Sequence, residues 1–118
     1  MPEKQIQAAI VRLLRMIGAH VYVLGTRRRA GDHPGTMQTP GIADLFVLLP
    51  APPLARPVLP LALWIEVKAP RGRVSAAQIA FADQCLAAGM PYLRGGIDEV
   101  IDYLTGFGWL KSEHPIMQ

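Results

Sequence analysis

Two acidic residues and a lysine lie at positions where neighbouring strands would bring them together. Asp44 is near the start of the apolar segment 43–49 (ADLFVLL), and Glu66 and Lys68 end the segment 61–68 (LALWIEVK). If the segments pair as antiparallel strands, the start of the first lies beside the end of the second, so Asp44 meets Glu66. Adjacent carboxylates repel unless a cation holds them, and Mg²⁺ prefers such oxygen ligands. Lys68 would then orient or deprotonate a water molecule, or balance the charge of a phosphate.

Each of these residues also has a simpler explanation. Side chains alternate along a strand, so Glu66 and Lys68 share a face and can form a strand-end ion pair, which contributes little to stability. Asp44 can cap a turn or the start of its strand. The residue types and their spacing leave both explanations open.

Two further polar residues belong to predicted helices. Apolar residues recur every three or four positions in 3–17, which predicts a helix with Glu3 over the middle of its apolar stripe. A carboxylate there needs a partner, unless Glu3 is only a first-turn acid stabilised by the helix dipole. Gln78 follows Ser75 at the spacing of a capping box, which predicts a helix from Ser75 to about residue 88. Gln78 can cap this helix and also contribute to a site.

The other segments complete a small α/β domain. Strands are predicted at 20–24 and 91–94 and a last helix at 97–104, so helices flank a mixed central sheet. The very apolar segment 61–68 is expected at the centre of that sheet. Five prolines in 50–60 exclude a helix or a central strand there. The sequence predicts one domain over 1–110 and a loose tail over 111–118.

The composition limits the class of protein. The 118 residues include 12 Lys and Arg against 9 Asp and Glu, a net charge of +3, and 51% of the residues are apolar. This excludes a disordered tail, and no apolar run is long enough for a membrane span or a signal peptide. The single cysteine, Cys85, is expected to be buried and forms no internal disulfide. A cytoplasmic domain is therefore expected, and its high apolar content favours an oligomer.

Basic residues gather on either side of the two acidic strands. Arg27, Arg28 and Arg29 precede the Asp44 strand, and Arg71 and Arg73 follow Lys68. Both groups are expected at the same end of the sheet, where they would bind a DNA backbone through its phosphates. The alternative is that they are solvated loop residues.

The order of these motifs resembles the VRR-NUC branch of the PD-(D/E)XK nuclease superfamily, in its stand-alone phage and bacterial form. The resemblance rests on Glu3 in a first helix, the segments GIAD (41–44) and IEVK (65–68), and Gln78 in the next helix. It covers roughly residues 3–101. One position departs from the pattern, because the family usually has proline before the aspartate and this chain has Ala43.

The resemblance implies a restriction-endonuclease-like core in α-β-β-β-α-β order and metal-dependent hydrolysis of DNA phosphodiester bonds that leaves 5′-phosphates. It assigns Asp44, Glu66 and the backbone carbonyl of Val67 as ligands of Mg²⁺ or Mn²⁺. Such an ion polarises the phosphate and acidifies a bound water. Glu3 would hold a metal-bound water or a second ion.

The resemblance also assigns Lys68 to position or activate the attacking water, and Gln78 to orient Lys68 or the substrate phosphate. Small members resemble dimeric four-way-junction resolvases, and no sequence-reading module such as a zinc finger is visible. A homodimeric endonuclease selective for branched DNA is therefore expected. The alternatives are a restriction-type subunit that needs a specificity partner, a non-catalytic DNA-binding module, and a dimeric structural protein with a fortuitous EVK strand.

Overall fold

The computed structural model describes residues 1–24, 39–51 and 61–111. Arg27, Arg28 and Arg29, most of the proline-rich segment and the predicted tail beyond Lys111 lie outside these ranges. Within them, the elements follow the predicted order: α1 (Glu3–Met16), β1 (His20–Val23), β2 (Leu45–Leu48), β3 (Ala62–Val67), α2 (Ala76–Ala87), β4 (Tyr92–Gly95) and α3 (Ile97–Gly106). None of these described helices is long and apolar enough to cross a bilayer.

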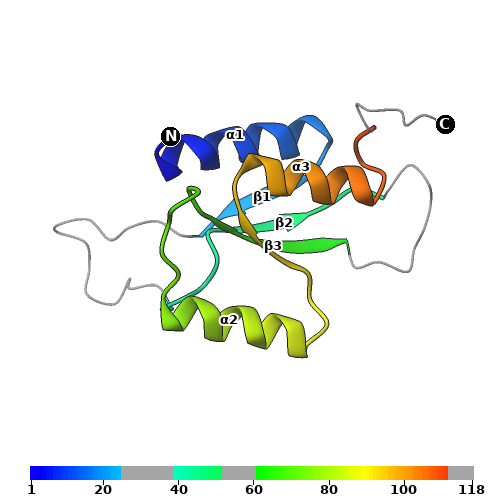
Figure 1. Cartoon of the computed structure of the whole chain (residues 1–118). Coiled ribbons are helices and arrows are strands. Elements are labelled where there is room, and N and C mark those ends of the chain that lie inside the picture. The colour runs from blue at the N-terminus through cyan, green and yellow to red at the C-terminus, as the bar shows by residue number, and fades with distance from the viewer. Residues whose placement is uncertain (25–38, 52–60, 112–118) are drawn as a thin grey trace, which may run out of the picture.

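The four described strands form one mixed sheet in the order β1-β2-β3-β4. β1 pairs antiparallel with β2, and β2 pairs antiparallel with β3, whereas β3 and β4 are parallel. α1 and α3 cover one face of this sheet and α2 covers the other (Figure 1). The mixed sheet, its flanking helices and the interior place of β3 confirm the fold predicted from the sequence.

The main hydrophobic core lies between the sheet and the pair α1 and α3. Leu63 and Ile65 of β3 are fully buried there, and Val67 is 1% exposed. They meet the apolar stripe of α1, whose buried residues are Ile6, Ile10 and Leu14. Burying apolar area on this scale is the main stabilising contribution in a domain of this size. It also fixes which face of β3 carries Glu66, because side chains alternate along the strand.

Aromatic residues cross the opposite face of the sheet in register. Tyr22, Phe46, Trp64 and Tyr92 come from β1, β2, β3 and β4, and each is paired with the next in the sheet. Phe81 of α2 packs edge-on against Trp64, with ring centroids 5.1 Å apart. This contact anchors α2 above the strand that carries Glu66. Cys85 of α2 is buried, as predicted.

Gly41 allows the segment before β2 to pass close to α2. Its φ is +82°, and a Cβ atom on it would overlap the backbone carbonyl of Ala77. An L-residue in this left-handed conformation already costs about 1–2 kcal/mol, and the overlap with backbone adds to that cost. Gly41 therefore sets the approach of Asp44, three residues later, to the helix that carries Gln78.

Replacing Gly41 with alanine is expected to lower the free energy of unfolding by about 3 kcal/mol, because strain and overlap act together. Gly89→Ala is the matched control, since Gly89 also has a positive φ (+70°) but nothing lies within 4 Å of an added Cβ. This control should lose only about 1 kcal/mol. Denaturant unfolding measures both variants, and equal losses would contradict the close approach at Gly41.

Candidate active site

The end of β3 and the segment leading into β2 meet through Asp44. Its Oδ2 accepts a hydrogen bond of 2.8 Å from the backbone N–H of Val67. Asp44 therefore lies beside the end of β3, next to Glu66, as the antiparallel pairing predicts. The N–H and the carbonyl of a strand residue point to the same side, so the Val67 carbonyl also faces the Asp44 side of β3.

Glu66 is a buried carboxylate with one unpaired oxygen. Its residue is 3% exposed, and its Oε2 accepts a hydrogen bond of 2.8 Å from Nε2 of Gln78. The Nζ of Lys68 is 3.7 Å from the same oxygen. The Oε1 is buried and has no hydrogen-bond partner. Leaving a buried charged oxygen unpaired is costly, so Glu66 favours a proton shared with the neighbouring Asp44, or a cation in its place.

The pKa values of both carboxyl groups reflect this crowding. Burial, followed by the negative charge of Asp44, raises the pKa of Glu66 to about 7, although Lys68 opposes the shift. Burial also raises the pKa of Asp44, against the hydrogen bond from Val67. With no cation present, the pair holds a proton near neutral pH far more readily than an ordinary carboxyl group does. A divalent ion would replace that proton.

The donor set of the site fits a hard cation that keeps part of its hydration shell. Asp44 and Glu66 supply two neighbouring carboxylates, one with an unpaired buried oxygen, and the Val67 carbonyl lies on the same side. The described ranges hold no group of three or more Asp, Glu, His or Cys side chains placed to bind one metal. Mg²⁺ is commonly held by one or two carboxylates with waters and substrate phosphates, so two are enough.

Glu3 lies near the two carboxylates but contacts a different group. Its Oε2 accepts a hydrogen bond of 3.3 Å from the backbone N–H of Ala69, the second residue after β3. The side chain is exposed, yet its negative charge raises the pKa values of Asp44 and Glu66. α1 therefore brings Glu3 to the predicted end of the sheet, where Glu3 holds the segment after β3.

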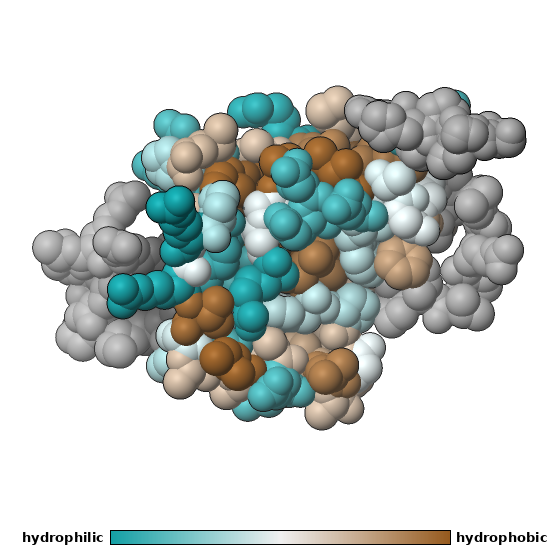
Figure 2. Space-filling view, viewed as in Figure 1, coloured by the Kyte–Doolittle hydropathy of each residue, from teal (hydrophilic) through white to brown (hydrophobic). Residues whose placement is uncertain are grey.

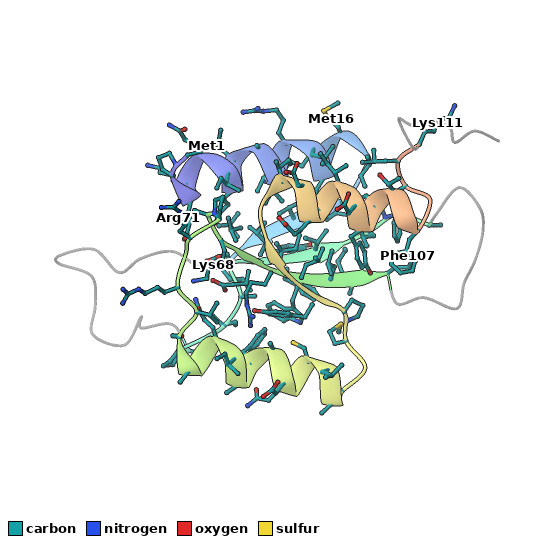
Figure 3. All side chains as sticks on the ribbon, viewed as in Figure 1. Met1, Met16, Lys68, Arg71, Phe107 and Lys111 are labelled. Atoms are coloured by element: carbon teal, nitrogen blue, oxygen red, sulfur yellow. The ribbon has the colours of Figure 1, made fainter. Side chains whose placement is uncertain are left out.

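Lys68 is anchored at two points. Its Nζ donates a hydrogen bond of 2.6 Å to the backbone carbonyl of Arg73 and lies 3.7 Å from Glu66. The side chain is 14% exposed. Figure 3 shows Lys68 and Arg71 at the same end of the molecule, beside the segment that follows β3. Arg71 and Arg73 are both exposed in that segment. The ammonium group is thus fixed beside the carboxylates with cations around it.

Gln78 joins the cap of α2 to the carboxylate site. Its backbone N–H donates to Oγ of Ser75, and its Oε1 accepts from the backbone N–H of Ser75, which is the predicted capping box. Because Oε1 is used in the cap, Nε2 faces Glu66 and donates to it. Gln78 therefore orients Glu66, whereas the sequence interpretation had it orient Lys68 or a phosphate.

Gln78→Glu separates these two roles. Glutamate at this position preserves the capping box, but a carboxylate replaces the amide that donates to Glu66. We expect little loss of helix α2 and at least a 10-fold loss of Mn²⁺ affinity, since a contact that orients a ligand is removed. Calorimetry with Mn²⁺ and circular dichroism measure the two effects. Unchanged Mn²⁺ affinity would mean that the contact between Gln78 and Glu66 has no role in the site.

Comparison with known proteins identifies the fold. No family model matches the sequence, and no curated protein matches it. A solved structure described as a VRR_NUC domain matches with a TM-score of 0.59 and 19% sequence identity, over 88% of this chain and 94% of that chain. This chain has the fold of a VRR_NUC domain.

In this VRR_NUC fold, three segments converge on Glu66: the approach to β2 brings Asp44, the N-terminus of α2 brings Gln78, and the N-terminus of α1 brings Glu3. Sequence reasoning missed one residue on the same face, Arg94 of β4. The parallel pairing of β3 and β4 places Arg94 opposite Glu66. A helix between two apolar strands is the signal that could have indicated this pairing.

Proposed function

We propose that this protein is a metal-dependent endonuclease of the PD-(D/E)XK type that hydrolyses DNA phosphodiester bonds and leaves 5′-phosphates. The observation that carries the proposal is Glu66, a buried carboxylate with an unpaired Oε1, beside Asp44 and within 3.7 Å of the Lys68 ammonium. The VRR_NUC fold supports it, since the name of the matching structure describes a nuclease domain.

In this proposal, Asp44, Glu66 and the Val67 carbonyl hold Mg²⁺ or Mn²⁺. Such an ion, when bound, withdraws charge from the scissile phosphate and lowers the pKa of a coordinated water. Asp44 is held for this task by the Val67 N–H, and Glu66 by Gln78. Glu3, which lies near both carboxylates, adds negative charge and would reach the ion through water.

Lys68 acts beside the carboxylates. Its ammonium group, anchored on the Arg73 carbonyl, donates hydrogen bonds to the attacking water or to the phosphate and balances negative charge as the phosphate is attacked. Arg71 and Arg73, both exposed, contact the DNA backbone next to this centre. We assign the same role to Arg27, Arg28 and Arg29, which lie outside the described residues.

We further propose a homodimer that cuts branched DNA such as four-way junctions. α2 is mostly apolar and has no single polar face, yet Cys85 is its buried residue, while Ile79 is 48% and Leu86 79% exposed. Figure 2 shows apolar patches over α2, at the bottom of the view, with hydrophilic residues between them. A helix of this composition is normally covered on more than one side. A second copy would cover it and supply a second site for paired cuts.

Leu86→Glu should then give a monomer in analytical ultracentrifugation.

The direct test is a cleavage panel. Labelled four-way junctions, flaps and plain duplex are incubated with the protein in Mg²⁺, Mn²⁺ or EDTA, and product ends are checked for 5′-phosphate. The proposal expects metal-dependent cutting, fastest on branched DNA. Cutting only with an added partner would favour a restriction-type subunit. DNA binding with neither metal binding nor cutting would indicate a non-catalytic module. Absence of DNA binding at low salt would contradict the nuclease altogether.

A further inference from the structure

Arg94 stands one strand away from Glu66, on the same face of the sheet. The parallel register pairs Trp64 with Tyr92 and Glu66 with Arg94. Paired residues in neighbouring strands point to the same side, about 5 Å apart. Arg94 is therefore a cation at the end of the sheet where Asp44, Glu66 and Lys68 gather, although it is far from them in the sequence.

The guanidinium of Arg94 is positioned but has no anion. Its Cζ lies over the Tyr92 ring, 5.5 Å from the centroid, which is a cation–π contact. Its Nε is buried and has no hydrogen-bond partner. Within the described ranges, the Lys68–Glu66 pair is the ion pair found, and Arg94 forms none, although Asp83 lines one pocket with it and Asp98 and Glu99 line another. The Tyr92 side chain accepts a hydrogen bond from Arg94, so Arg94 has a neutral partner. Its buried Nε stays unpaired, which is unfavourable for a donor.

The two unpaired groups on this face have opposite charge but do not pair with each other. The Oε1 of Glu66 and the Nε of Arg94 both lack partners, although their residues are opposite one another in neighbouring strands. No hydrogen bond or ion pair joins Arg94 to that oxygen. Their separation leaves Glu66 available to a cation and Arg94 available to an anion.

A pocket connects Arg94 with Lys68 around the ends of β3 and β4. Its volume is about 500 Å³, and its lining includes the two cations, the acidic residue Asp98, and apolar side chains from three segments, Ile6, Val74 and Ile97. Gly95 and Gly96 form part of its wall, where the backbone carries no side chain. Glu99 also lines it, but its Oε1 already accepts the N–H of Gly96. The pocket is of a size for a single nucleotide and its phosphates, and too small for a duplex.

We propose that Arg94 binds a DNA phosphate adjacent to the scissile one, and that the cleaved strand follows the pocket from Lys68 to Arg94. The inference rests on the proposed nuclease function and adds a substrate contact to it. A guanidinium donates two parallel hydrogen bonds to a phosphate, which the single point charge of lysine does not reproduce. Tyr92 holds the guanidinium in place, and its terminal nitrogens would make this contact, since Nε is buried.

The test compares Arg94→Met and Arg94→Lys with Arg15→Met, which removes an exposed arginine near the far end of α1. Affinity for labelled branched DNA is measured by fluorescence anisotropy in Ca²⁺ over a range of salt concentrations, and cleavage is measured in Mg²⁺. For Arg94→Met we expect about 10-fold weaker binding and a salt slope of log Kd reduced by about one, as for loss of one phosphate contact. Arg94→Lys should restore the slope but only part of the affinity.

Three outcomes decide the inference. If Arg94→Met binds DNA with the affinity and salt slope of Arg15→Met, the contact does not exist, while cleavage by the wild type would leave the nuclease function intact. A melting temperature lowered by more than about 10 °C in both Arg94 variants would make Arg94 a structural residue and overturn the assignment. If the wild type neither binds nor cuts DNA, the proposed function fails, and the inference fails with it.

Discussion

Lys68→Met is expected to lower the rate of DNA cleavage by about 10²–10⁴-fold, the usual contribution of a positioned proton-transfer or charge-balancing group. Methionine keeps most of the apolar stem and removes the ammonium group that lies 3.7 Å from Glu66 and donates to the Arg73 carbonyl. The fold should persist, since the core on the other face of β3 is untouched. Single-turnover cleavage of a labelled junction in Mg²⁺ measures the effect.

Two controls separate a lost chemical role from a lost metal site. Mn²⁺ titration by calorimetry should show that Lys68→Met still binds the ion, because Asp44 and Glu66 remain. Lys111→Met removes an exposed lysine at the far end of the described chain and should cleave at the wild-type rate. Cleavage by Lys68→Met at the rate of Lys111→Met would disprove the role assigned to Lys68.

Glu66→Gln is expected to abolish divalent-ion binding and to stabilise the metal-free protein at high pH. The pKa of Glu66 rises from an ordinary value of 4.5 to about 7 in the folded protein, chiefly through burial. A raised carboxyl pKa contributes stability that is complete below pH 4.5 and is lost as the pH rises through 7. The wild type should therefore lose up to about 3 kcal/mol between these values, at about 1.4 kcal/mol per pH unit. The neutral glutamine avoids this loss.

Denaturant unfolding from pH 4.5 to 8.5 measures this difference, with and without Mn²⁺. In EDTA, Glu66→Gln should match the wild type near pH 4.5 and exceed it above pH 7. A smaller dependence remains from Asp44, whose pKa burial also raises. Added Mn²⁺ should stabilise the wild type at pH 8.5 and leave the variant unchanged. Asp102→Asn, at an exposed position of α3, should keep the wild-type pH dependence. If the wild type in EDTA is equally stable at pH 4.5 and pH 8.5, the raised pKa of Glu66 is contradicted.

Much of the site follows from local patterns. Ser75 and Gln78 form their capping box because both partners lie within one helical turn, and the alternation along β3 fixes the face that carries Glu66. The antiparallel pairing of β2 with β3 joins segments of matching apolar pattern, so Asp44 was predicted beside Glu66. These features depend on short-range geometry, which the sequence encodes directly.

Other features depend on how distant elements pack. Gln78 donates to Glu66 because Phe81 anchors α2 over Trp64, a contact that no spacing in the sequence reveals. The Lys68 ammonium donates a hydrogen bond to the backbone carbonyl of Arg73. Every residue type has such a carbonyl, so the sequence does not indicate which one the lysine contacts.

The sequence by itself determined the mixed α/β fold, the central strand and the group of acidic residues at its end, because apolar periodicity and strand alternation are sufficient for these. Only the tertiary structure decided that Glu66 keeps an unpaired oxygen and that Arg94 stands beside it. Burial and the parallel crossover through α2 produce both features. Both features come from packing between segments that are far apart in the chain. A local sequence pattern does not report the free energy of such packing.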